Sequence, residues 1–98
     1  MEAKLICYTL GKISASARTQ FKRELTGYVD HSNKGKYNYK RGGLLDQFPN
    51  IKPIRSVIIV KPEDEKKVVK FLKKFDSEYY VYDVILKNKD LKRLVKDN

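Results

Sequence analysis

Three apolar runs and one alternating run predict four strands. The apolar runs cover residues 4–10 (KLICYTL), 54–61, which contains SVIIV, and 79–86 (YYVYDVIL). The first two lack a regular polar position, which indicates strands buried on both faces. Residues 36–41 alternate instead. Tyr37, Tyr39 and Arg41 fall on one face and Lys36 and Lys40 on the other, as in a strand near a sheet edge.

Apolar residues with helical spacing predict two longer helices and a short terminal one. In the first, Ala17, Phe21 and Leu25 recur every four residues before a stop at Gly27. Ser14 or Ser16 supplies its N-terminal cap. The second helix begins at Pro62, with acidic residues in its first turn and lysines in its last, an arrangement that matches the helix dipole. The buried face of the second helix consists of Val68, Leu72 and Phe75, with Val69 and Phe71 beside them. The apolar stripe of the third consists of Leu91, Leu94 and Val95, and Asn88 caps this helix.

The segments between these elements carry turn residues. Residues 29–35 (VDHSNKG) predict a turn, because Asp, Ser and Asn bond to nearby backbone and Gly tolerates positive φ. Gly42 and Gly43 end the alternating strand, and residues 44–48 predict a short helical turn. Pro49 and Pro53 predict an irregular connection.

The resulting order is strand, helix, strand, strand, helix, strand and a terminal helix. This order predicts a ferredoxin-like α/β sandwich, with an antiparallel four-stranded sheet and two helices on one face. We expect residues 1–98 to form a single compact domain, because one core typically serves about 100–150 residues. Open sheet edges and the terminal helix also suggest a homodimer.

Composition narrows the class of protein. No apolar stretch reaches membrane-spanning length, and the first apolar run is too short for a signal peptide, so we expect no membrane association. The lone Cys7 cannot form an internal disulfide and is interpreted as a small buried hydrophobe. A cytoplasmic location fits this cysteine usage.

Charge is the strongest global signal. The chain has 22 Lys and Arg against 12 Asp and Glu, a net charge of +10. Residues 18–41 hold 7 basic and 2 acidic side chains, so this quarter of the chain carries +5. A clustered basic excess is typical of proteins that bind a phosphate backbone. The alternative is that the lysines only keep a small protein soluble.

These observations predict a small nucleic-acid-binding protein, with DNA or RNA left open. Basic side chains would neutralise phosphates and the two strand tyrosines would stack on unpaired bases. In the alternative interpretation, the tyrosines only pack on the sheet and Arg41 pairs with a carboxylate or a helix end. The predicted interface comprises Arg18, Lys22, Arg23, Lys34, Lys36, Tyr37, Tyr39, Lys40 and Arg41.

Two other function classes stay open. The first is a metal-independent nuclease or phosphoryl-handling enzyme centred on His31, Tyr39 and Arg41, where the histidine would transfer protons and the arginine would stabilise charge. As the only histidine in the chain, His31 excludes a two-histidine mechanism within one copy, and a solvent-exposed turn histidine is the simpler interpretation. The second is a small dimeric adaptor that binds an acidic protein.

The sequence lacks the residues that several known types of site require. No HxH, CxxC or HExxH spacing occurs, so we expect no metal site and no cofactor. Cas2-like nucleases carry an Asp at the end of the first strand, where this chain has Tyr8, Thr9 and Leu10. Acylphosphatases need an Arg in the first loop, where Lys12 and Ser14 stand. The third-strand signature of RNA-recognition-motif domains has no counterpart in residues 55–60, RSVIIV. A Gly42–Gly43 anion-binding turn is a weak further hypothesis.

Overall fold

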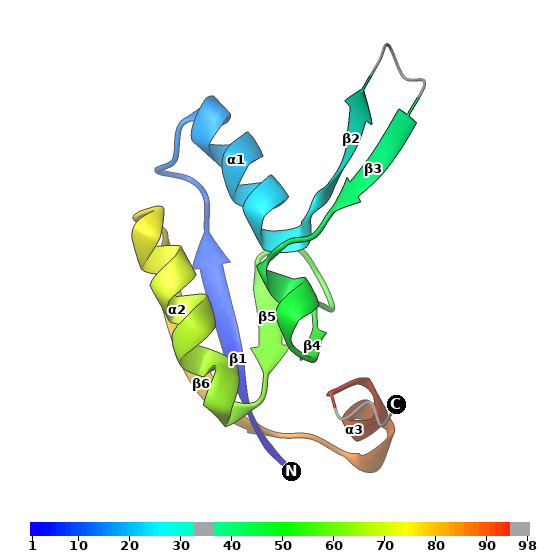
Figure 1. Ribbon diagram of the computed structural model, residues 1–98. Coiled ribbons are helices and arrows are strands. Elements are labelled where there is room, and N and C mark those ends of the chain that lie inside the picture. The colour runs from blue at the N-terminus through cyan, green and yellow to red at the C-terminus, as the bar shows by residue number, and fades with distance from the viewer. Residues whose placement is uncertain (33–36, 95–98) are drawn as a thin grey trace. The chain divides into compact units, whose positions relative to one another are not determined.

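Figure 1 shows the computed structural model, which describes residues 1–32 and 37–94. For residues 31, 32, 37, 38 and 91–93 only the backbone is described. The chain divides into two compact units, which are taken separately below. The sheet unit comprises residues 1–13 and 49–98, and the hairpin unit comprises residues 14–48. The expectation of a single domain stays a prediction.

The sheet unit contains a four-stranded antiparallel sheet in the order β4-β5-β1-β6. Its strands are β1 (Glu2–Thr9), β4 (Asn50–Ile51), β5 (Val57–Val60) and β6 (Glu78–Ile85). The sequence correctly predicted a mixed α/β fold with such a sheet, but it assigned the wrong second strand. Residues 37–41 pair elsewhere, and β4 lies where a connection was expected. Strand β4 has only two residues and lies between Pro49 and Pro53, so it is too short to show a strand pattern.

One face of this sheet holds the main core of the unit. Strand alternation places Ile6, Ile58 and Val60 on this face, and all three are fully buried. Helix α2 (Glu65–Lys74) follows the short 3-10 helix η2 (Pro62–Asp64) and buries Val68, Phe71 and Leu72. An ion pair of 3.7 Å between Lys4 Nζ and Glu65 Oε1 joins this face of β1 to the start of α2. The predicted core position Phe75 is only half-buried.

The opposite face is only partly covered. Helix α3 (Asn88–Leu94) buries Leu94 in a cluster with Ala3 and Ile51 at one end of the sheet. Further along the same face, Leu5 and Cys7 of β1 remain half-buried. The prediction that β1 is buried on both faces is therefore correct for one face only, because a short helix cannot cover the whole of the other.

The hairpin unit consists of one helix, a two-stranded sheet and a 3-10 turn. Its elements are α1 (Ala15–Thr26), β2 (Tyr28–Ser32), β3 (Tyr37–Arg41) and η1 (Leu44–Gln47). Ser14 caps α1 as predicted, because its Oγ accepts a hydrogen bond of 3.3 Å from the Ala17 amide. The helix buries Phe21 and Leu25, and the segment after the hairpin buries Leu45 and Phe48.

Strand β2 corrects the sequence-based turn at residues 29–35. Residues 28–32 instead pair antiparallel with β3. Local turn preferences are weak here compared with the five backbone pairings that β3 supplies. Tyr28, the first residue of this strand, is 38% exposed.

Two glycines allow α1 and the end of the hairpin to approach backbone to backbone. Gly27 ends α1 with φ of 82°, a conformation that favours glycine, and its amide bonds to Arg23 O. A Cβ added at Gly43 would lie 2.4 Å from Gly27 N and 2.5 Å from Leu25 O. Since both of these atoms belong to the backbone, no side chain can move away to make room. The glycines therefore fix the base of the hairpin against the helix end.

We expect Gly43→Ala to destabilise the hairpin unit by about 1–3 kcal/mol, the usual range for overpacking. The measurement is the free energy of unfolding by urea, followed by circular dichroism. Gly42→Ala is the matched control, because a Cβ there meets only the Asp46 side chain, at 3.3 Å. Equal stability of the two variants would contradict the close backbone contact.

Candidate nucleic-acid interface

The β2–β3 register places four polar or aromatic side chains on one face of the hairpin. Tyr28 lies opposite Arg41, and Asp30 lies opposite Tyr39. Cross-strand partners share a face of a sheet, and so do residues two positions apart on one strand. We call Tyr28, Asp30, Tyr39 and Arg41, together with Arg23 from α1, the arginine–tyrosine face.

Arg23 joins this face through a cation–π contact. Its guanidinium carbon lies 4.9 Å from the centre of the Tyr28 ring. The contact follows from local sequence, because Gly27 ends the helix and turns the chain directly into β2. An exposed pair of this kind contributes about 0.5–1 kcal/mol and holds the arginine in one orientation. Sequence analysis named Arg23 but did not foresee its partner.

Arg41 is paired with an acid of the neighbouring strand. Its Nη2 lies 3.2 Å from Asp30 Oδ2 and its Nε lies 3.4 Å from the same oxygen. Both side chains are substantially exposed, 57% for Arg41 and 39% for Asp30, so the pair contributes at most about 1 kcal/mol to stability. One alternative interpretation of Arg41, a carboxylate partner, is therefore correct. The pair is exposed enough for a phosphate to compete for the arginine.

Tyr39 lies at the accessible end of the described face. About half of its surface, 51%, is exposed, as is 51% of Val29 on the opposite face. The alternative, in which Tyr39 only packs on the sheet as a half-buried ring, stays open at this exposure. A ring on an open strand surface is the geometry that base stacking requires.

The other predicted phosphate contacts do not all join this face. Lys40 lies opposite Val29 and therefore occupies the reverse side of the hairpin, as the alternation predicted. Arg18 and Lys22 are exposed on α1. At about 100° per residue they lie roughly 40° apart, with Arg23 about 100° beyond Lys22. They form a separate row along the helix.

Some predicted site residues lie outside what the structure describes. Lys34 and Lys36 fall within residues 33–36, which are not described. Tyr37 and His31 are described by backbone register alone, opposite Ser32 and Asn38. The pair of His31 with Asn38 does not belong to the alternating set of cross-strand pairs that contains Tyr39 and Arg41. The register therefore gives no support to a common site for these three residues, and the nuclease stays a hypothesis.

The Gly42–Gly43 turn has a structural explanation. The Gly43 amide donates a hydrogen bond of 2.8 Å to Asp46 Oδ2 within the turn. An amide that bonds to a carboxylate of its own chain is not available to an external anion. The simpler interpretation, a chain reversal, accounts for both glycines together with the close approach to α1.

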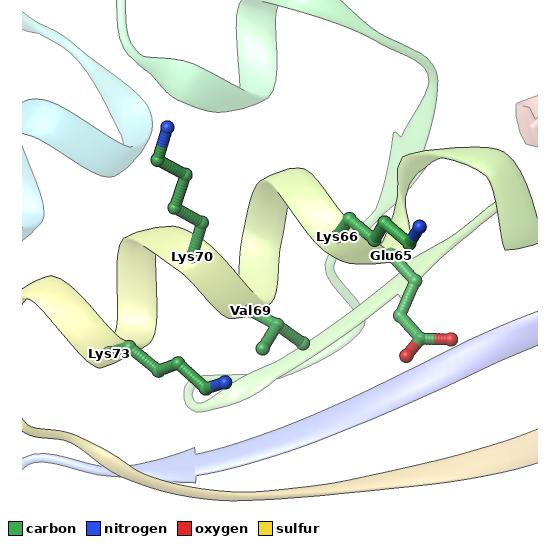
Figure 2. Close-up of a pocket in the computed structure, with 5 residues that line it drawn as sticks. All are labelled: Glu65, Lys66, Val69, Lys70 and Lys73. Atoms are coloured by element: carbon green, nitrogen blue, oxygen red, sulfur yellow. The ribbon is translucent and has the colours of Figure 1, made fainter.

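A second basic surface, which sequence analysis did not identify, lies on α2 of the sheet unit. Lys66, Lys70 and Lys73 line an open pocket with Glu65 and Val69 (Figure 2). Sequence analysis interpreted the lysines of the last helical turn only as partners of the helix dipole. It did not single out Lys66. Their spacing of three and four residues, which repeats along one helix side, is the signal that could have found them.

Comparisons with known proteins do not assign a function. No protein-family model, no curated protein and no solved structure matches the chain. Within residues 1–32 and 37–94, no helix is long and apolar enough to cross a membrane. In the same part of the chain, no group of three or more His, Cys, Asp or Glu side chains is arranged to hold a metal ion.

The Asp30–Arg41 pair leads to a specific expectation for binding. Asp30→Asn should raise the affinity for an oligonucleotide at low salt by about three- to tenfold, because it removes a negative charge and frees Arg41 for phosphate. Fluorescence anisotropy measures the change. Glu24→Gln is the matched control, because it removes the same charge from α1, where Glu24 bonds to Gln20. Equal gains in both variants would show that only net charge matters.

Proposed function

We propose that this protein binds nucleic acid through the arginine–tyrosine face of its hairpin unit. The observation that carries the proposal is that Arg23, Tyr28, Tyr39 and Arg41 share one exposed face, although they come from α1, β2 and β3. Two arginines alternating with two aromatic rings combine the two contacts that a nucleic acid offers, phosphate and base. The clustered charge of residues 18–41 supports the same conclusion.

In this proposal each side chain has a separate role. Arg41 exchanges the Asp30 carboxylate for a phosphate, and Arg23, oriented by the Tyr28 ring, contacts a second phosphate. Tyr39 stacks on an unpaired base. Arg18, Lys22 and Lys40, on other sides of the unit, add a longer-range attraction, and Lys34, Lys36 and Tyr37 remain predicted contacts. The lysines of α2 give the sheet unit a basic surface of its own.

We also propose that the sheet unit follows the ferredoxin-like strand order, with the hairpin inserted between the first helix and the second sheet strand. When β2 and β3 are set aside, β1, β4, β5 and β6 are the first to fourth sheet strands along the chain. Across the sheet they then lie in the order second, third, first, fourth, and each neighbour is antiparallel. This order supports the proposal. A cytoplasmic location, where cellular nucleic acid is available, is part of this proposal.

The phosphate contacts should appear in the salt dependence of binding. Arg23→Gln and Arg41→Gln are each expected to lower the slope of log affinity against log salt by roughly 0.7–0.9, the value for one lost phosphate contact. Anisotropy titrations with single- and double-stranded DNA and RNA over a salt series provide the slopes. Lys87→Gln, at an exposed position after β6, is the control for loss of one charge. No binding at low salt would overturn the proposed function.

Tyr39 should determine whether the protein prefers single-stranded or double-stranded nucleic acid. Tyr39→Ala is expected to weaken binding to single strands by about 1–3 kcal/mol and to leave duplex binding nearly unchanged, because only unpaired bases can stack on the ring. The same titrations supply both affinities. Tyr39→Phe is the matched control, since it retains the ring and removes only the hydroxyl group. Equal losses for single strands and duplexes would contradict stacking.

A further inference from the structure

Strand β6 forms an exposed edge of the sheet unit. It pairs with β1 along its whole length, from Glu78 opposite Thr9 to Ile85 opposite Glu2. In the sheet order β4-β5-β1-β6 it is the last strand, and within the described chain nothing pairs with its outer side. An edge strand of eight residues is a template for pairing with another strand.

The backbone groups that β6 directs outward follow from the ladder. The Leu86 amide bonds to Met1 O at 2.9 Å, so residues of even number in β6 direct their backbone groups toward β1. The Tyr8 amide confirms the phase, because it bonds to Ser56 O on the opposite side of β1. Tyr79, Val81, Asp83 and Ile85 consequently direct their amides and carbonyls outward.

This edge lacks three features with which proteins usually prevent pairing: basic side chains, proline and a bulge. Residues 75–86 contain no Lys, Arg or Pro, the longest stretch of the chain without a basic side chain. The register with β1 is constant over all eight pairs, so the strand has no bulge. Tyr80 and Tyr82 share a face and are each 55% exposed, and Ile85 is 81% exposed.

The charge of β6 indicates whether this edge suits a nucleic acid or a second copy of the chain. Tyr80 Oη donates a hydrogen bond of 2.7 Å to Glu78 Oε1, and this bond raises the pKa of the tyrosine. Acid groups beside the exposed rings disfavour phosphate. Asp83 is already held by Lys4 of β1 and therefore carries little uncompensated charge. In a chain of net charge +10, a strand without basic side chains adds no cation–cation repulsion between two copies.

We propose that two copies of this chain associate through β6, in antiparallel pairing about a two-fold axis at Val81. The axis lies perpendicular to the sheet, and the two four-stranded sheets become one sheet of eight strands. Tyr79, Val81 and Asp83 of each copy bond to Asp83, Val81 and Tyr79 of the other. All of these residues direct their backbone groups outward, so the register uses the available groups. This association does not depend on the proposed function.

The same register gives complementary side-chain neighbours. Tyr80 of each copy lies opposite Tyr82 of the second copy, which makes two aromatic cross-strand pairs on one face. On the other face Val81 meets its own symmetry mate and Asp83 meets Tyr79. Glu78 lies opposite Val84. In this register no two like charges face one another across the axis. A stable isologous interface requires this, because like charges directly opposite one another destabilise strand pairing.

Analytical ultracentrifugation from micromolar to millimolar protein tests the association. The native chain should form dimers, and Tyr80→Lys/Tyr82→Lys should raise the dissociation constant by more than about tenfold, because four cations then meet. Tyr80→Lys/Tyr82→Glu is the matched control, since opposite charges would face one another and dimers should persist. Both positions are exposed, and circular dichroism verifies that the variants fold.

Amide hydrogen exchange by NMR locates the contact. In the dimer the amides of Tyr79, Val81 and Asp83 should exchange more slowly than in the monomer, whereas those of Tyr80 and Tyr82 bond to β1 and should be protected in both. A chain that stays monomeric at millimolar concentration overturns the proposal, as does a double-lysine variant that dimerises normally. If the Tyr80→Lys/Tyr82→Glu variant dissociates as readily as the double-lysine variant, the two-fold axis at Val81 is rejected. Oligonucleotide binding at Tyr80 and Tyr82 of a monomer would assign this face to nucleic acid instead.

Discussion

Where the end of α1 meets the end of β3, two glycines leave room for backbone against backbone, and the candidate interface depends on this contact. Gly43 lies so close to Gly27 and Leu25 that any side chain would separate the two segments. The positive φ of Gly27 turns the chain from the helix into β2. Arg23, on the last turn of the helix, therefore reaches Tyr28 on the first residue of the strand. An arginine of the helix and a pair of strands thus become one face.

The hairpin face combines an internal ion pair with a surface that remains open. Arg41 has a carboxylate partner of its own chain, but the pair is too exposed to contribute much stability. A phosphate can replace that carboxylate at small cost, since the arginine loses one charged partner and gains another. Asp30 lowers the positive charge of the face and keeps Arg41 oriented beside Tyr28.

The two units of the chain differ in what they expose. The hairpin unit presents arginine with tyrosine, whereas β6 of the sheet unit presents tyrosine with glutamate and aspartate. An aromatic ring is suited to base stacking or to a protein contact, and the neighbouring charge decides between them. This difference is why we assign nucleic acid to one surface and a second copy of the chain to the other.

Elements with strong local signals could be predicted from the residues alone. Ser14 and Gly27 bound the first helix, SVIIV gave β5, and the alternation of residues 37–41 gave β3 with the correct residues on each face. The clustered charge also comes from sequence alone. These features depend on neighbours in the chain, and a periodic pattern records them.

Which segments meet depends on contacts between residues that are far apart in the chain. The VDHS residues favour a turn locally, yet pairing with β3 makes them a strand, and the two residues of β4 carry no pattern of their own. Three contacts likewise depend on which segments the fold brings together. They are those of Arg23 with Tyr28, Arg41 with Asp30 and Gly43 with Asp46. Long-range pairing supplies hydrogen bonds and burial that outweigh local preference, so such contacts leave no local signal in the sequence.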